Sequence, residues 1–215
     1  SSGELLFNSD EHGVFDQSAV FILFDLNPDY FKHRLFKREK ADSYDFGKET
    51  GAYIKQQFKN SSVIVGASGL DLDGQRFVEG IKETAGNNLV MFGGLAGDDG
   101  KFEKTFVFDE HTVTDSGATL VVFDNRKVKL SGMATSGWVG LGMDLTITKS
   151  KGNVVYTVDD KPALDVYLEY LNINVNDMPV IGLEYPLLIK RDDNTDALRA
   201  VTGIDKETRS LLFAG

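Results

Sequence analysis

The chain has 215 residues, enough for a sizeable hydrophobic core, and its 41% hydrophobic and 26% charged residues are typical of a folded protein. A net charge of −10 without a run of Lys and Arg argues against nucleic acid or an anionic membrane surface as a partner. The absence of cysteine excludes disulfides and thiolate chemistry, and no apolar run is long enough to predict membrane insertion.

The first half of the chain predicts strands and helices in alternation. Short runs rich in β-branched and aromatic residues predict strands over residues 17–26, 32–38, 61–67 and 88–95. Apolar residues at helical spacing predict helices over 43–59, with Asp42 or Ser43 as the N-cap, and over 71–84.

The second half predicts mainly strands joined by tight turns. Strands are expected over residues 102–109, 118–123, 128–133, 141–148 and 154–158, with a hairpin turn at 124–127. A helix is expected over 162–171, with Pro162 in its first turn. Strand character resumes at 185–189 and 197–204, and the apolar end, 211–215, shows no partner in the sequence.

A glycine-rich stretch, Gly93-Gly94-Leu95-Ala96-Gly97-Asp98-Asp99, follows an apolar strand. Glycine permits positive φ and lets a backbone or a ligand come close. The stretch matches neither the P-loop nor the dinucleotide-binding pattern, and its two aspartates would repel phosphate. A tight hairpin with an acidic tip is the alternative interpretation.

Two serine-containing segments add candidates. Ser1-Ser2-Gly3-Glu4 is either a functional motif or a cloning remnant. Ser68 lies at a strand-to-helix turn that resembles an incomplete nucleophile elbow. Ser68, Asp98 and His111 stand in hydrolase order, but a chain of this size offers many such triples, and the favoured interpretation of Ser68 is a structural serine that caps the next helix.

The single tryptophan, Trp138, lies in a segment rich in small residues that also contains Ser136. Its ring is expected either in a core or in the wall of a pocket. His12, His33 and His111 are too scattered for a metal-ligand signature, so we expect neither a metal nor a cofactor.

Taken in order, these motifs resemble the FIST family of sensory domains. Ser1 to Glu4 resemble the end of its early G-C-S-[ST]-x-G-E motif, and Gly93 to Asp98 resemble its central G-G-x-A-G-D motif. Similar matches follow at 137–142, 154–171, 185–187 and 199–215. The resemblance implies a FIST N-type domain over 1–172 without its first strand and helix, then a linker and the start of a FIST C-type domain over 173–215.

The resemblance implies a sensory domain of a bacterial, cytoplasmic signalling protein. Its ligand would be an amino acid or a similar metabolite, and its partner a downstream signalling module. Serine-dependent hydrolase and non-catalytic interaction scaffold are the alternatives. The expected binding residues come from the small-residue turns: Ser1, Ser2, Gly3, Glu4, Ser68, Gly93, Gly94, Gly97, Asp98, Asp99, Ser136 and Trp138.

The order of elements predicts an α/β (α+β) fold. We expect a mixed, mostly antiparallel sheet core with flanking helices. The long strand-rich stretch over 88–158 would crowd a single sheet, so two packed sheets are an alternative to one.

Overall fold

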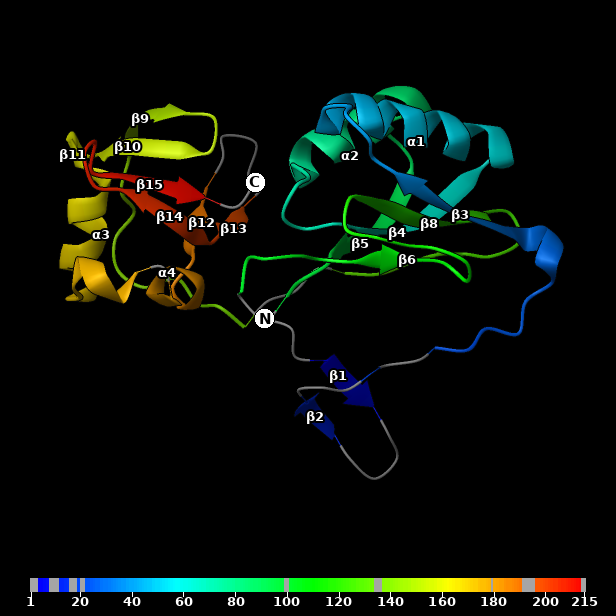
Figure 1. The fold of residues 1–215 in the computed structure, drawn as a ribbon, viewed down its shortest axis with the longest axis horizontal. Coiled ribbons are helices and arrows are strands. Elements are labelled where there is room, and N and C mark those ends of the chain that lie inside the picture. The colour runs from blue at the N-terminus through cyan, green and yellow to red at the C-terminus, as the bar shows by residue number, and fades with distance from the viewer. Residues whose placement is uncertain are drawn as a thin grey trace. The chain divides into compact units, whose positions relative to one another are not determined.

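The computed structural model describes residues 4–7, 12–15, 19, 22–98, 101–133, 137–178, 180–190 and 196–213. These residues form an α+β fold with several sheets that are mostly antiparallel, as the sequence predicted (Figure 1). The chain divides into two compact units, residues 1–134 and residues 135–215.

The first unit contains a four-stranded sheet in the order β3-β8-β4-β5. Its strands are β3 (Phe31–Lys37), β8 (Gly117–Asp124), β4 (Ser61–Ala67) and β5 (Val90–Leu95). Strands β4 and β5 are parallel, whereas β8 pairs antiparallel with both β3 and β4. A parallel pair needs a long crossover connection, and helix α2 (Gly74–Ala85) supplies it between β4 and β5.

Helices α1 (Ser43–Gln57) and α2 cover one face of this sheet (Figure 1). Asp42 caps α1 by accepting hydrogen bonds from the backbone of Tyr44 and Asp45. Asp73 caps α2 in the same way. The core between the helices and the sheet is built mainly from buried apolar side chains: Phe46, Ile54, Val63, Phe77, Ile81, Ala118, Leu120 and Val122.

The two helices approach each other closely because glycines lie between them. A Cβ atom on Gly80 would lie 2.1 Å from the carbonyl oxygen of Tyr44, and one on Gly47 would lie 2.2 Å from that of Phe77. No side chain fits at these points, so the glycines set the distance between the helices.

Two short antiparallel hairpins also belong to the first unit. One joins β1 (Glu4–Phe7) to β2 (His12–Phe15), and the other joins β6 (Val107–Phe108) to β7 (Val113–Thr114). A 3₁₀ turn, η1 (Pro28–Tyr30), leads into β3.

The second unit has a sheet of five strands. Strand β10 (Val154–Val158) pairs with β9 (Ile147–Lys151), β11 (Lys161–Pro162) and β15 (Ser210–Phe213), and β15 also pairs with β14 (Val201–Asp205). Helix α3 (Ala163–Leu171) packs on this sheet through Leu164 and Tyr167. The second unit also contains the turn η2 (Val175–Asp177) and the helix α4 (Val180–Glu184). Its remaining strands, β12 (Leu187–Ile189) and β13 (Ala197–Arg199), form an antiparallel pair.

Several predicted strands differ from the structure. The described part of 17–26 forms no strand, and Ile22, Leu23 and Phe24 are 71%, 95% and 65% exposed. Residues 128–133 form no hairpin with β8 because β3 and β4 already occupy both of its edges.

Other differences concern strand length and the end of the chain. The predicted strand over 102–109 is limited to β6, and that over 141–148 begins only at Ile147. The apolar end does have partners, because β15 lies between β10 and β14 and Leu211 is only 1% exposed. Within the described part of the chain, no helix combines the length and the apolar character needed to cross a bilayer.

Candidate functional site

A groove of about 450 Å³ lies between α2 and β5, the terminal strand of the first unit's described sheet. Its walls are mostly apolar and include side chains from β4, α2 and β5. Lys82 and Asn87 are the polar side chains in the lining, and the backbone of Gly93 and Gly94 completes it. We refer to this pocket as the α2–β5 groove.

The groove exists because β5 is the last strand in the described sheet and carries glycine where it borders the pocket. Gly93 has a φ of 152°, and a Cβ atom there would lie 1.8 Å from the carbonyl oxygen of Val65, so only glycine fits. A Cβ atom on Gly94 would meet no atom within 4 Å. At Gly94 the missing side chain leaves the backbone of β5 open to a ligand.

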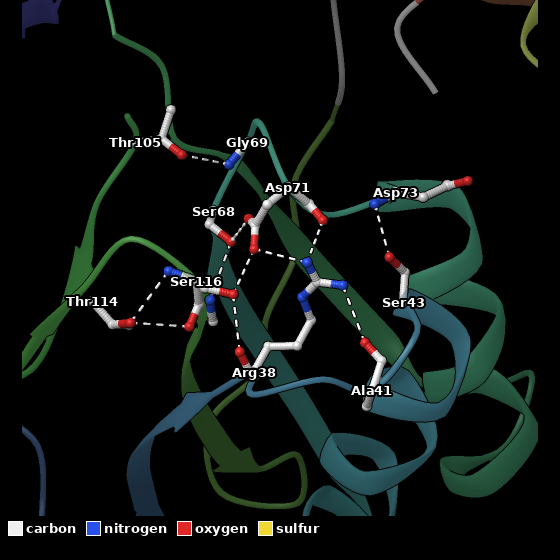
Figure 2. Close-up of polar contacts among 11 residues, drawn as sticks. Arg38, Ala41, Ser43, Ser68, Gly69, Asp71, Asp73, Thr105, Thr114 and Ser116 are labelled. Carbon is white, nitrogen blue, oxygen red and sulfur yellow. Dashed lines mark hydrogen bonds and ion pairs between the residues drawn. The ribbon is translucent and has the colours of Figure 1, made fainter. Parts of the chain in front are cut away.

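A polar network fixes the turn that follows β4 (Figure 2). The fully buried hydroxyl of Ser68 donates a hydrogen bond of 2.7 Å to Asp71 Oδ1 and accepts one of 3.1 Å from the backbone N–H of Gly117. The other carboxylate oxygen of Asp71 accepts hydrogen bonds from Arg38, at 2.8 Å, and from the hydroxyl of Ser116.

Further hydrogen bonds tie neighbouring segments to this turn (Figure 2). Arg38 also donates to the carbonyl oxygen of Ala41, and the N–H of Gly69 donates to Thr105 Oγ1 at 2.8 Å. The network therefore joins the end of β3, the end of β4 and the loop before β6. Such a polar cluster makes this end of the sheet rigid, although the buried Nε of Arg38 has no hydrogen-bond partner among the described residues.

Asp71 stays ionised within this network. Its partial burial favours the neutral acid, but hydrogen bonds from Ser116, Ser68 and Arg38, together with the Arg38 charge, outweigh burial and lower its pKa below the ordinary value. A carboxylate with a lowered pKa is a poor general base, so the Ser68–Asp71 contact does not activate the serine.

Asp98 organises the loop after β5. One of its carboxylate oxygens accepts hydrogen bonds from the backbone N–H groups of Glu103, at 2.7 Å, and Lys104, at 3.2 Å. Desolvation works against ionisation, but the hydrogen bonds from Glu103, Phe102 and Lys104 together outweigh it and lower the pKa of Asp98. The loop thus keeps a negative charge near the end of β5.

The structure places part of the predicted site together. Because β4 and β5 are parallel, the turn with Ser68 lies beside the segment with Gly97 and Asp98, and the N–H of Ala96 donates to the carbonyl oxygen of Ala67 at 2.8 Å. Gly93 and Gly94 line the groove. A Cβ atom on Gly97 would meet no atom within 4 Å.

The remaining predicted residues belong to other elements or have no described position. Glu4 belongs to β1, and Trp138 belongs to the second unit, where it is 52% exposed. Five predicted residues lie outside the described part of the chain: Ser1, Ser2, Gly3, Asp99 and Ser136.

Sequence reasoning missed the contribution of α2. Val78 and Lys82 line the groove one turn apart, but on a helix this spacing is equally typical of a core-facing residue next to a solvent-exposed one. The signal that was available is the glycine pair on β5, which lacks side chains to fill the space opposite the helix.

The serine, acid and histidine in hydrolase order have separate partners. Ser68 contacts Asp71, whereas Asp98 binds its own loop. His111 is exposed and lies 3.7 Å from Glu110, which also pairs with His33 at 2.8 Å. Among the residues with described positions, no three acids or histidines cluster in a way that would hold a metal ion.

Comparison with known proteins gives one family and one relative. A sequence model of the FIST N domain matches residues 1–161. An uncharacterized protein of Methanocaldococcus jannaschii is 35% identical over 85 residues, which cover 39% of this chain and only 16% of that protein. No solved structure matches the chain.

Proposed function

This chain belongs to the FIST N domain family, and on that premise we propose that it binds a small metabolite, with an amino acid as the leading class, and passes the event to a signalling partner. FIST domains are sensory, non-catalytic domains of signalling proteins. The proposal also includes a cytoplasmic location and a FIST N-type domain over 1–172, with the start of a FIST C-type domain over 173–215.

The observation that carries the proposal is the α2–β5 groove. Its volume of about 450 Å³ falls within the range of small-ligand pockets, which are mostly apolar with a few polar groups. The side chains of Phe77, Val78 and Met91 offer an apolar wall to the side chain of a ligand. An apolar amino acid matches this wall better than a charged one.

Charged groups of both signs are available for the ends of an amino acid. Lys82 lines the groove and forms no ion pair among the described residues, so its ammonium is suited to a carboxylate. Asp98, with its lowered pKa, is the candidate for the ligand's ammonium. Backbone groups of Gly93 and Gly94 would supply further hydrogen bonds.

Ser68 has a supporting role in this proposal. Its buried hydroxyl already has two hydrogen-bond partners, so it orients the turn beside the groove. Glu4, Gly97, Asp99, Ser136 and Trp138, with the Ser1-Ser2-Gly3 segment, stay candidates for the remaining part of the site.

Thermal-shift screening of the full chain with amino acids and related metabolites tests the proposal, because a ligand that binds only the folded state raises the melting temperature. We expect stabilisation by apolar amino acids and its loss in Lys82→Met. Lys55→Met is the matched control, since Lys55 occupies the last turn of α1 and does not line the groove. Absence of any shift across the panel would contradict the proposal.

A further inference from the structure

Two segments of the first unit repeat each other at constant spacing. Residues 10–25 read DEHGVFDQSAVFILFD and residues 109–124 read DEHTVTDSGATLVVFD, so each position has its counterpart 99 positions later. Eight of the sixteen positions are identical, among them Asp-Glu-His at the start and Phe-Asp at the end. Self-similarity without a gap over this length indicates two copies of one structural element.

The backbone supports the repeat where both copies are described. Strand β2 in the first copy pairs antiparallel with β1, and its counterpart β7 pairs antiparallel with β6. Phe15 lies opposite Glu4, and its counterpart Thr114 lies opposite Val107. Each copy therefore contains the second strand of a short hairpin at the same place in the repeat.

The copies differ after the hairpin. In the second copy the chain continues into β8, whose Val122 and Phe123 are buried between β3 and β4. Their counterparts in the first copy are Leu23 and Phe24, which are exposed and form no strand. Consecutive apolar residues are typical of a strand that is covered on both faces, so the first copy has the composition of a central strand without its neighbours.

The pairing of β3 with β8 indicates which residues should be the strand partner of the first copy. β3 follows the first copy but pairs with the strand of the second copy, with Phe31 opposite Phe123. The reciprocal neighbour would follow the second copy and pair with the strand of the first. The counterpart of Phe31 at the same spacing is Leu130, within the segment 128–133 that the structure leaves without a strand partner among the described residues.

We propose that residues 22–25 form a strand that docks antiparallel on residues 129–132 of the same chain, with Phe24 opposite Leu130 and Ile22 opposite Gly132. This pair is the reciprocal of β3 and β8 and has the same register. A Cβ atom on Gly132 would lie 3.0 Å from the ring of Phe92 on β5, so Gly132 already lies against an apolar side chain of the sheet. The pairing does not depend on the ligand site.

Engineered disulfides test the register, because the chain has no cysteine of its own. Directly opposite residues in an antiparallel pair have Cα atoms about 4.5–5.5 Å apart, a distance that a disulfide spans. Phe24→Cys combined with Leu130→Cys in the full chain should form an intrachain disulfide in most molecules under mild oxidation. Leu23→Cys with Leu130→Cys is the matched control and should form little, because neighbouring side chains on a strand point to opposite faces.

Hydrogen exchange in the unaltered chain provides a second measurement, free of substitutions. The amides of residues 22–25 should exchange at least roughly tenfold more slowly than those of an unstructured peptide. Three outcomes would overturn the proposal: equal cross-linking of the control pair, disulfides that join two chains, or no cross-link together with unprotected amides. The second of these outcomes would identify another copy of the chain as the partner.

Discussion

Helix α2 packs against α1 on one side and borders the α2–β5 groove on the other. Between the helices, Gly80 leaves no room, because a Cβ atom would lie 2.1 Å from the Tyr44 carbonyl oxygen. On the groove side, a Cβ atom on Gly74 would lie 3.3 Å from a terminal methyl of Leu95, which can move. One helix therefore joins a closed core to an open pocket, and ligand binding on its open side need not disturb its packing on the other.

The largest expected change in the free energy of unfolding comes from a substitution in the closely packed contact between α1 and α2. Gly80→Ala should lower the free energy of unfolding by about 3 kcal/mol, because the new methyl group overlaps a backbone atom that cannot move alone. Gly74→Ala places the same methyl group in the same helix but on the groove side. It should leave the free energy of unfolding within about 0.5 kcal/mol of that of the original protein, or raise it slightly. Urea unfolding measures both, and equal losses would contradict the contrast.

The next effect concerns the polar network beside the groove. Asp71→Asn should cost about 2 kcal/mol, because Ser68, Ser116 and Arg38 lose a charged acceptor. The folded pKa of Asp71 is lowered, so its stabilisation is present above about pH 4 and is lost as pH falls through the folded pKa. The difference between the two proteins in urea unfolding should therefore shrink between pH 7 and pH 3. A constant difference would show that the charge is unimportant.

A smaller loss of stability is expected at Ser68, and it tests whether this serine has a structural role or contacts the ligand. Ser68→Ala should lower the free energy of unfolding by about 1 kcal/mol, because the carboxylate of Asp71 and the N–H of Gly117 each lose a hydrogen-bond partner. Ligand-induced thermal shifts should persist in this variant. Their complete loss, with the fold intact by circular dichroism, would make Ser68 a direct ligand contact.

The smallest effect on stability is expected inside the groove. Val78 is half-buried and lines the groove, so Val78→Phe adds volume where about 450 Å³ is open and should change the free energy of unfolding by no more than about 0.5 kcal/mol. The same variant should abolish ligand-induced thermal shifts by filling the site. Retained binding would place the ligand elsewhere on the domain.

Local signals in the sequence were sufficient for the elements around the groove. The cap Asp42 and the apolar spacing of α1 predicted a helix over 43–59, close to the observed Ser43–Gln57. The apolar run of β4 predicted its strand over 61–67 without error. Both signals act within one element, so they can be read without knowledge of the rest of the fold.

Strand pairing could not be predicted in the same way, because it depends on which edges are free. Residues 128–133 follow a hairpin-like turn, but β8 already has β3 and β4 as neighbours, and both come from earlier in the chain. The same limit applies to the site. The glycines of β5 indicated an open backbone, whereas Lys82 became a candidate only once β5 was seen to be the last strand of the described sheet.

The position of β15 between β10 and β14 has a consequence for how the second unit forms during synthesis. Strand β10 is translated more than fifty residues before β15, yet among the described strands it is Ser210–Phe213 that joins β10 to β14. Residues 147–205 are therefore made before their sheet can be completed, while Val155 and Val201 still lack their strand neighbours Leu211 and Phe213. A stalled or shortened chain would expose this surface, and we expect chaperones to bind it at that stage.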